Sequence, residues 1–183
     1  MGDWFAMDSD QELIELVNKG DADAFEVLYR RYRDWIYHLA WRFTGNQQDT
    51  LDVLQETFTY LLGKFPGFSL TASMTTFLYP VVRHISLTIR SKSRRFTSDE
   101  EILSELTAPA LKDTQSSRSE LAAILTVLPD EQREVLLMRF IDDMSLQEIA
   151  TAINIPLGTV KSRLHHALNT LRRDSRTKDY FLE

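Results

Sequence analysis

Apolar residues recur every three or four positions along most of the chain, which is the period of a helix with one buried face. The longest such stripe consists of Phe25, Leu28, Tyr29, Tyr32, Trp35, Ile36, Leu39, Ala40 and Phe43. Similar stripes predict helices at about residues 10–19, 47–62, 75–94, 119–128, 130–140, 145–153 and 156–173. No segment has the alternating pattern of a half-buried strand, so we predict an all-α fold.

Several residues predict where these helices begin and end. Ser9, with Glu12 three residues later, forms a capping-box pattern, and Asp21 is suited to cap the next helix. Gly20 and Gly45 are suited to end the first two helices. The third helix is expected to bury Leu51, Leu54, Phe58, Leu61 and Leu62.

Pro80 falls within the fourth predicted helix. An interior proline removes a backbone donor and clashes with the preceding turn, at a cost of roughly 3 kcal/mol. The first turn tolerates proline, because its N–H groups have no partner within the helix. We therefore expect the regular helix to begin near Tyr79, with Pro80 in its first turn.

Residues 97–117 interrupt the helical pattern. This segment is acidic and rich in Ser and Thr, and a short helix is expected there only at about residues 100–106. We interpret it as a flexible linker between two small helical domains. The predicted organisation is an N-terminal extension at 1–8, domains at 9–96 and 118–175, and a tail at 176–183.

The formal net charge of −6 conceals an uneven distribution. Residues 77–95 hold five bases and no acid, and residues 156–178 hold six bases and one acid. Residues 1–26 hold eight acids and one base, and residues 98–120 hold six acids and two bases. Two separate basic blocks in an acidic chain predict two surfaces that face an anionic partner such as nucleic acid.

The composition argues against several other classes of protein. The 183 residues include no Cys, so neither a disulfide framework nor a thiolate metal site is expected. No apolar run reaches the roughly 18 residues of a membrane span, and the acidic N-terminus does not resemble a signal peptide. Without a glycine-rich phosphate loop or a nucleophile–base pair, we expect no enzyme, no cofactor and no bound metal. The expected location is the cytoplasm.

The last two predicted helices form a helix-turn-helix pattern. Asn154 and Ile155 make a short turn between them, in which Asn154 tolerates a left-handed backbone, and Pro156 suits the first turn of the second helix. One sector of that helix is apolar and holds Val160, Leu164, Ala167, Leu168 and Leu171. The opposite sector lacks carboxylates and holds Thr159, Ser162, His165, His166 and Asn169, with Lys161 and Arg163 at its margins. Such a helix can enter the major groove of DNA.

Two alternative interpretations of this helix compete with DNA binding. A plain helical hairpin would also expose a polar face, but the short turn, the proline and the absence of carboxylates favour DNA. A metal site at His165 and His166 is disfavoured, because adjacent residues diverge by about 100° around a helix.

Motifs in both halves of the chain resemble one family. The C-terminal half contains LPDEQREVL at residues 128–136, SLQEIA at 145–150 and GTVKSRL at 158–164, and the N-terminal half contains DVLQETF at 52–58. In this order they resemble bacterial RNA polymerase sigma factors of the extracytoplasmic-function group, within the sigma-70 superfamily. The resemblance implies a factor that directs core RNA polymerase to promoters, reads −10 and −35 elements and assists promoter melting.

The resemblance and the helix geometry together indicate three groups of site residues. The −35 element would meet Arg139, Gln147, Pro156, Thr159, Lys161, Ser162, Arg163, His165 and His166. The −10 element would meet Phe65, Phe68, Arg83, His84, Arg90, Arg94 and Arg95, although Phe65 and Phe68 are equally suited to a core. A coiled coil of the largest polymerase subunit would meet Asp52, Gln55 and Glu56, which fall on the polar side of the third helix.

The resemblance also implies other partners. These are promoter DNA, the polymerase beta flap and an anti-sigma factor, with the free chain a monomer. The acidic linker would mimic nucleic acid in a basic polymerase channel. Pro80 and His84 depart from the family's usual pattern, so the details of −10 reading are not carried over. A stand-alone helix-turn-helix regulator is the alternative, and it leaves the DVLQETF motif without a role.

Overall fold

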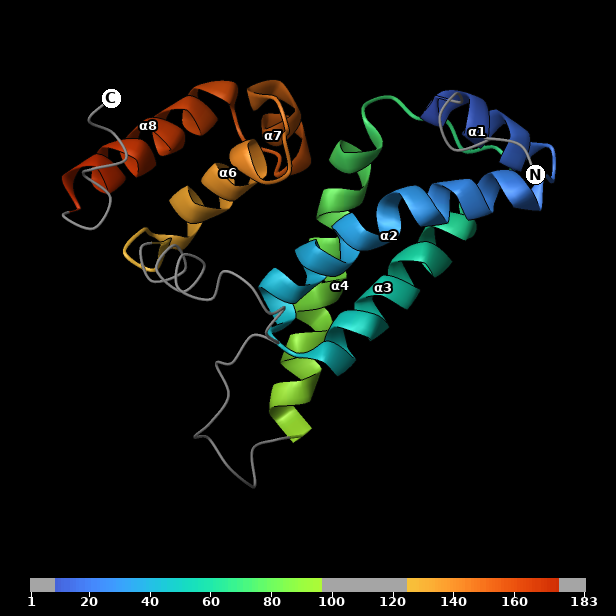
Figure 1. Cartoon of the computed structure of the whole chain (residues 1–183), viewed down its shortest axis with the longest axis horizontal. Coiled ribbons are helices and arrows are strands. Elements are labelled where there is room, and N and C mark those ends of the chain that lie inside the picture. The colour runs from blue at the N-terminus through green and yellow to red at the C-terminus, as the bar shows by residue number, and fades with distance from the viewer. Residues whose placement is uncertain (1–8, 97–124, 175–183) are drawn as a thin grey trace, which may run out of the picture. The chain divides into compact units, whose positions relative to one another are not determined.

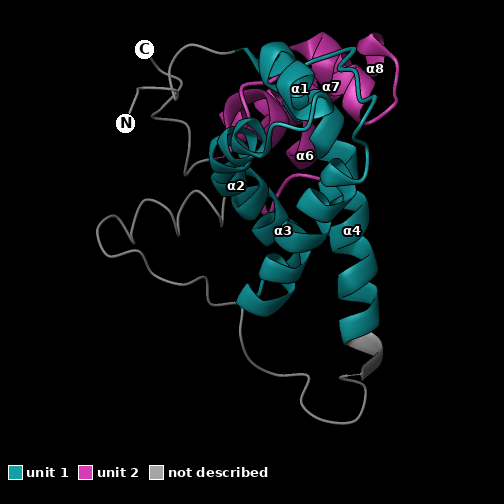
Figure 2. Ribbon diagram, turned by 90° about the vertical axis from the view of Figure 1, so that its right-hand side faces the viewer, with its two compact units in different colours: residues 1–108 teal, residues 109–183 magenta. Residues whose placement is uncertain are grey.

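The computed structural model describes residues 9–96 and 125–174, and every regular element within these ranges is a helix (Figure 1). The chain divides into two compact units, residues 1–108 and 109–183 (Figure 2). The predicted all-α fold in two parts is confirmed. The predicted linker at 97–117 lies outside the described residues, so the domain boundaries stay predictions.

Within its described residues, 9–96, unit 1 consists of the helices α1 (Asp10–Asn18), α2 (Ala22–Thr44), α3 (Gln47–Leu62) and α4 (Met74–Phe96). α2 packs against each of the other three helices, and α3 also packs against α4. Each helix contributes side chains that are at most 2% exposed to the core, among them Leu13, Ile14, Leu28, Ile36, Leu39, Val53, Leu61, Met74, Leu78, Tyr79 and Val82. The core therefore draws on the helix stripes that the sequence predicts.

Capping residues set the boundaries of these helices. Ser9 and Glu12 form a capping box at α1, in which the Ser9 N–H donates to the Glu12 carboxylate at 2.7 Å. This hydrogen bond lowers the pKa of Glu12. Asp21 caps α2, Asn46 caps α3, and Gly45 ends α2 with a left-handed backbone (φ 74°). The predicted caps at Ser9 and Asp21 and the stop at Gly45 are confirmed.

The buried face of α3 differs from the predicted one. Leu61 and Phe58 lie in the core as expected, but Leu51 and Leu62 are 43% and 53% exposed, so their prediction as core residues was wrong. Adjacent residues diverge by about 100°, so Leu61 and Leu62 cannot share one face. With Leu61 inward, the positions four, eight and eleven residues earlier follow it into the core, and these are Thr57, Val53 and Thr50.

Pro80 lies inside α4, so the expectation that the regular helix begins near Tyr79 was wrong. The helix begins at Met74, more than one turn earlier. Met74 and Leu78 are completely buried, and Tyr79 is 2% exposed. The core thus anchors the chain directly before the proline, and this burial offsets the cost of an interior proline.

Replacing Pro80 with alanine is expected to stabilise unit 1 by about 1–3 kcal/mol. Alanine supplies an N–H group that can donate to the carbonyl of Thr76, four residues earlier. Pro80 is exposed, so little packing is removed, although alanine also enlarges the unfolded ensemble and reduces the gain. Urea unfolding followed by the fluorescence of Trp35 and Trp41 on α2 would measure the change. An unchanged midpoint would mean that the helix is already adapted to proline.

Unit 2 contains α6 (Asp130–Phe140), α7 (Leu146–Ala152) and α8 (Leu157–Arg173), and α7 packs against both other helices. α6 and α8 share a core cluster of Leu128, Leu136, Ala167 and Leu171, edged by Leu125, Leu164 and Leu168. The Arg133 guanidinium fixes the chain that enters α6 by donating to the carbonyls of Leu125 (2.7 Å) and Leu128 (2.8 Å). The helix predicted at 119–128 lies largely outside the described residues.

Candidate nucleic-acid and polymerase interfaces

The turn between α7 and α8 has the geometry of a tight helix-turn-helix. Ser145 and Glu148 form a capping box that starts α7. Asn154 adopts a left-handed backbone (φ 51°), as predicted, and the Ile155 N–H donates to the carbonyl of Ala150 at 3.0 Å. Pro156 stands at the N-cap of α8, one position before the first turn where we expected it. The direction of α8 is therefore fixed by a very short segment.

Asn154 carries the backbone strain of this turn, so its replacement with glycine and its replacement with alanine should give different stabilities. Glycine adopts positive φ freely, whereas alanine does not. Asn154→Ala is expected to destabilise unit 2 by about 1 kcal/mol relative to Asn154→Gly. The difference would be measured as the free energy of unfolding of the two variants. Equal stabilities would argue against a strained left-handed turn.

The exposed face of α8 has the predicted polar character. Val160, Ala167 and Leu171 are buried, which turns the opposite side outward. The exposed side chains of that side are Lys161, Ser162, His165 and His166, with Thr159 half-buried. No Asp or Glu occurs between Leu157 and Arg173. The face therefore offers hydrogen-bond donors to an anion without the repulsion of a carboxylate.

The two arginines of the predicted −35 group have partners within unit 2. Arg163 forms an ion pair with Glu131 of α6, and its side chain is 23% exposed. Arg139 donates to the carbonyl of Met144 at 3.3 Å and lies 3.6 Å from the Asp143 carboxylate. Gln147 is exposed on α7. Both arginines therefore brace the unit, and their contact with DNA stays a prediction.

The α3–α4 loop comprises residues 63–73. Its residues Phe65 and Phe68 belong to an aromatic cluster. The Phe65 ring lies 6.2 Å from the Phe25 ring and 5.4 Å from the Phe68 ring, measured between centroids. The Phe68 ring lies 4.9 Å from the Phe77 ring of α4. Both loop rings are half-buried. They thus pack on the domain and still present part of their surface.

Some of the side chains on the predicted basic side of α4 lie within the described part of the structure. Arg83, His84 and Arg90 are exposed. Arg90 also donates to the carbonyl of Phe43, at the end of α2, at 3.2 Å. Arg94 and Arg95 lie in the last turn of α4, and their side chains are outside the described part of the structure.

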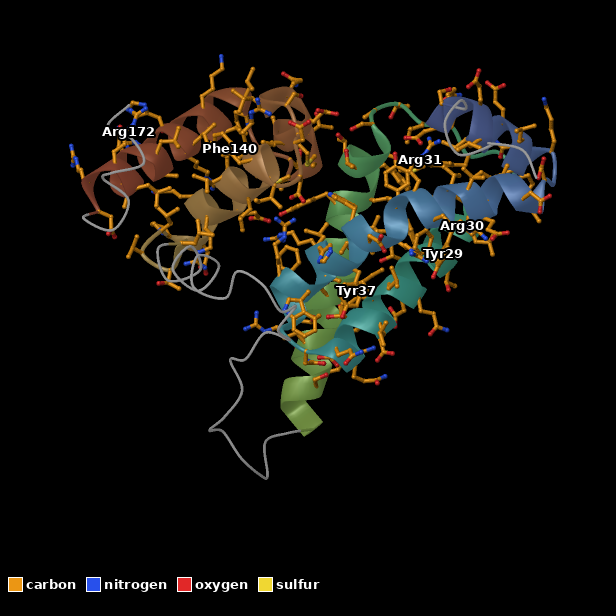
Figure 3. The ribbon with its side chains drawn as sticks, in the orientation of Figure 1. Tyr29, Arg30, Arg31, Tyr37, Phe140 and Arg172 are labelled. Atoms are coloured by element: carbon orange, nitrogen blue, oxygen red, sulfur yellow. The ribbon has the colours of Figure 1, made fainter. Side chains whose placement is uncertain are left out.

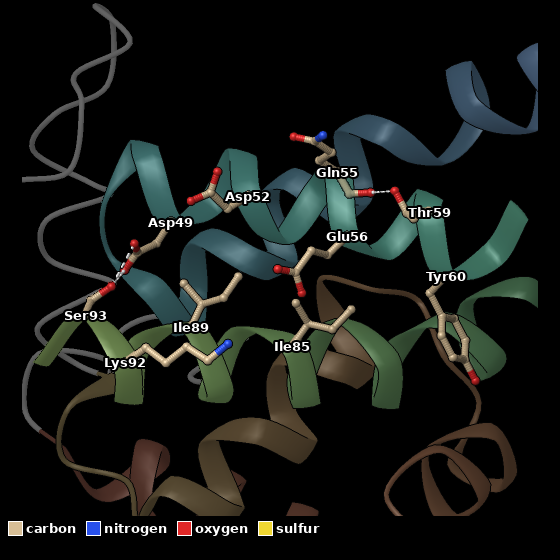
Figure 4. Close-up of a pocket in the computed structure, with 10 residues that line it drawn as sticks. All are labelled: Asp49, Asp52, Gln55, Glu56, Thr59, Tyr60, Ile85, Ile89, Lys92 and Ser93. Atoms are coloured by element: carbon tan, nitrogen blue, oxygen red, sulfur yellow. Dashed lines mark hydrogen bonds between the residues drawn. The ribbon is translucent and has the colours of Figure 1, made fainter. Parts of the chain in front are cut away.

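A groove of about 1000 Å³ runs between α3 and α4 (Figure 4). Its lining comprises Asp49, Asp52, Gln55, Glu56, Thr59, Tyr60, Ile85, Ile89, Lys92 and Ser93. Figure 4 shows the carboxylates on the α3 side and Ile85, Ile89 and Lys92 on the α4 side. The three residues of the predicted polymerase group thus share one groove, with an apolar wall opposite them. A basic partner with an apolar edge would complement it.

Sequence reasoning missed several features of these surfaces. Ile85 and Ile89 were not recognised as a groove wall, because their faces depend on how α4 packs on α3. Phe140, which is labelled in Figure 3, and the next residue, Ile141, are 59% and 62% exposed at the end of α6, and the helical stripes did not predict this apolar exposure. Asn18 binds the α3–α4 loop through hydrogen bonds to residues 49 and 50 positions away in sequence. No helix in the described ranges is long and apolar enough to cross a membrane.

Comparison with known proteins connects both units to one family. Residues 28–96 match the family Sigma-70 region 2, and residues 118–171 match Sigma-70, region 4. The chain is 33% identical to the ECF RNA polymerase sigma factor SigW of Bacillus subtilis, over 89% of this chain and 95% of that protein. It is 30% identical to the RNA polymerase sigma-H factor of Pseudomonas aeruginosa, over 87% of this chain and 90% of that one.

Two solved structures share the fold. CnrH in complex with the cytosolic domain of CnrY has a TM-score of 0.65 at 22% identity, covering 89% of this chain and 94% of that one. The sigma factor RpoE in complex with the anti-sigma factor NepR from Bartonella quintana has a TM-score of 0.63 at 20% identity, covering 81% of this chain and 94% of that one. The chain belongs to the ECF group of RNA polymerase sigma factors, which direct RNA polymerase to promoters and initiate transcription there.

Proposed function

We propose that α8 reads the −35 element through its exposed polar face. The observation that carries this proposal is a helix of 17 residues with exposed Lys161, Ser162, His165 and His166 and no acidic residue. Lysine suits phosphate or guanine, and serine and histidine can reach base edges in the major groove. Gln147 and Arg139 flank this face from the preceding helices.

The α3–α4 loop and the basic side of α4 are assigned to the −10 element. Promoter melting requires a base to be held outside the stack, against aromatic or apolar side chains with cations nearby. The half-buried Phe65 and Phe68 supply the rings, and Arg83 and His84 supply polar groups on the adjacent helix. Arg90, Arg94 and Arg95 would extend the cationic track toward the end of α4.

The groove between α3 and α4 is assigned to core RNA polymerase. Asp52, Gln55 and Glu56 offer acceptors to a basic coiled coil, and Ile85 and Ile89 offer apolar contact. The beta flap is the proposed partner of unit 2, where Phe140 and Ile141 expose apolar surface. Nucleotide addition belongs to the polymerase, so the chain itself is proposed to catalyse no reaction.

An anti-sigma factor is the remaining proposed partner. Both structural relatives described above were solved as complexes, one of them with a protein named as an anti-sigma factor. Such a partner would restrain the chain by covering the surfaces that core polymerase or DNA requires. The proposed place of action is the cytoplasm, where core polymerase and the chromosome are found.

Run-off transcription with core RNA polymerase tests these assignments together. A pool of promoter fragments would be transcribed with and without the chain, and the transcripts sequenced. Start sites that share both a −35 and a −10 motif are expected only when the chain is present. Tight duplex binding by the free chain without any stimulated initiation would instead indicate a stand-alone regulator.

A further inference from the structure

Asn18, the last residue of α1, makes three hydrogen bonds to the α3–α4 loop. Its side-chain oxygen accepts from the N–H groups of Gly67 (2.6 Å) and Phe68 (3.1 Å). Its side-chain nitrogen donates to the carbonyl of Phe68 at 2.8 Å. An amide is suited to this role, because one end accepts and the other donates. The side chain therefore engages both backbone polar groups of Phe68.

These hydrogen bonds fix the part of the loop whose backbone conformation least tolerates a residue other than glycine. Gly67 has a φ of 98°, a backbone region that residues with a Cβ rarely adopt. Directly after it, the Phe68 ring packs between the rings of Phe65 and Phe77. The aromatic contacts hold the ring, and Asn18 holds the backbone that carries it. Residues 69, 71 and 72, just beyond, are exposed.

α1 is itself firmly attached, so it can serve as an anchor. Leu13 and Ile14 are at most 1% exposed, and Asp10 forms an ion pair with Arg31 of α2 at 2.6 Å. Asp10 also accepts from the hydroxyl of Tyr32. Burial, together with this hydrogen bond, raises the pKa of Tyr32. Asn18 therefore connects the loop to a helix that is fixed independently.

We propose that Asn18 is a positioning residue for −10 recognition, which holds the α3–α4 loop in the shape that receives an unstacked base. This inference rests on the proposed function of the loop. A loop that is already ordered loses less conformational entropy when it binds a base, so its affinity is higher. Without the hydrogen bonds from Asn18, the loop rings would still pack, but the loop backbone would sample other conformations.

The test compares single-substitution variants of the full chain in complex with core RNA polymerase. The probe is a labelled single-stranded −10 oligonucleotide, taken from a promoter that the wild-type complex transcribes. Asn18→Ala is expected to lower its affinity about tenfold, and Asn18→Asp, which keeps the acceptor and removes the donor, should have a smaller effect. Ser9→Ala is the matched control, because it weakens the opposite end of α1 without contact to the loop.

A purely structural role would give a different pattern. If Asn18→Ala and Ser9→Ala retain the same −10 affinity, Asn18 only stabilises the fold and the inference is wrong. If Asn18→Ala fails to bind core polymerase, the Asn18→Asp variant is the test. Reduced −10 affinity of Asn18→Asp, with normal binding to core polymerase, supports the inference. Wild-type −10 affinity of Asn18→Asp overturns it. Phe68→Ala distinguishes a failure of the inference about Asn18 from a failure of the proposed function of the loop. If it leaves −10 affinity unchanged, the loop is not the reader and the proposed function fails as well.

Discussion

Replacing both Asp52 and Glu56 with arginine is expected to lower the affinity for core RNA polymerase by about a hundredfold or more. Both side chains line the α3–α4 groove, where they would face a basic partner. Close charge pairs at protein interfaces couple by about 1.5 kcal/mol or more each, and reversal replaces attraction with repulsion. Co-purification with core polymerase, followed by a competition assay against the wild-type chain, would measure the reduction.

The fold should survive this double substitution. Glu56 is exposed and Asp52 is half-buried, and surface carboxylates contribute little to folding. Helicity in far-UV circular dichroism is therefore expected to stay at the wild-type level. The matched control is Glu15→Arg with Asp34→Arg, which makes the same change of net charge on exposed positions of α1 and α2. If both double variants bind core polymerase as the wild type does, the groove is not the docking site.

The sequence predicts most clearly those features that depend on neighbours within one helix. Capping residues at Ser9 and Asp21, the stop at Gly45 and the left-handed Asn154 all act over three or four residues, and the structure confirms each. The polar face of α8 also follows from spacing alone, because α8 has one clear apolar sector. In these places, local chemistry and global packing require the same arrangement.

The features that sequence reasoning missed depend on packing between helices. Leu51 and Leu62 were assigned to the core from hydrophobicity, but the register set by Leu61 turns them outward. Pro80 was placed at a helix start from its local cost, but burial of Met74 extends the helix past it. In both cases a tertiary contact outweighs a local preference, and no pattern within a single helix records it.

The polar face of α8 likewise combines features that the sequence predicts with features that it does not. Lys161, Ser162 and His165 are exposed on the predicted face. The ion pair of Arg163 with Glu131 joins residues 32 apart, and no local pattern indicates it. Asn169 lies 2.8 Å from the Nε2 atom of His165, so one edge of that imidazole is already engaged. The other ring edge and the Ser162 hydroxyl remain the groups best suited to reading a base.

Substitutions on α8 are therefore expected to separate affinity from base preference at the −35 element. Lys161→Ala should remove one interaction with phosphate or guanine, and should reduce the slope of log affinity against log salt by about one if the interaction is with phosphate. Arg173→Ala removes the same charge about 18 Å further along the helix, so it is the matched control and should change the slope less. Both affinities would be measured with the holoenzyme on a duplex promoter.

Ser162→Ala and His165→Ala should instead change which −35 bases are preferred, by roughly 1–3 kcal/mol for each hydrogen bond to a base that the substitution removes. Both side chains are exposed on α8, and neither is part of the unit 2 core, so stability should be nearly unchanged. Leu171→Ala, in contrast, opens that core and should destabilise unit 2 by about 2–5 kcal/mol. The measurement is transcription from a promoter library randomised across the −35 element. If the Ser162 and His165 variants select the wild-type sequence from that library, α8 does not read the −35 bases through these residues.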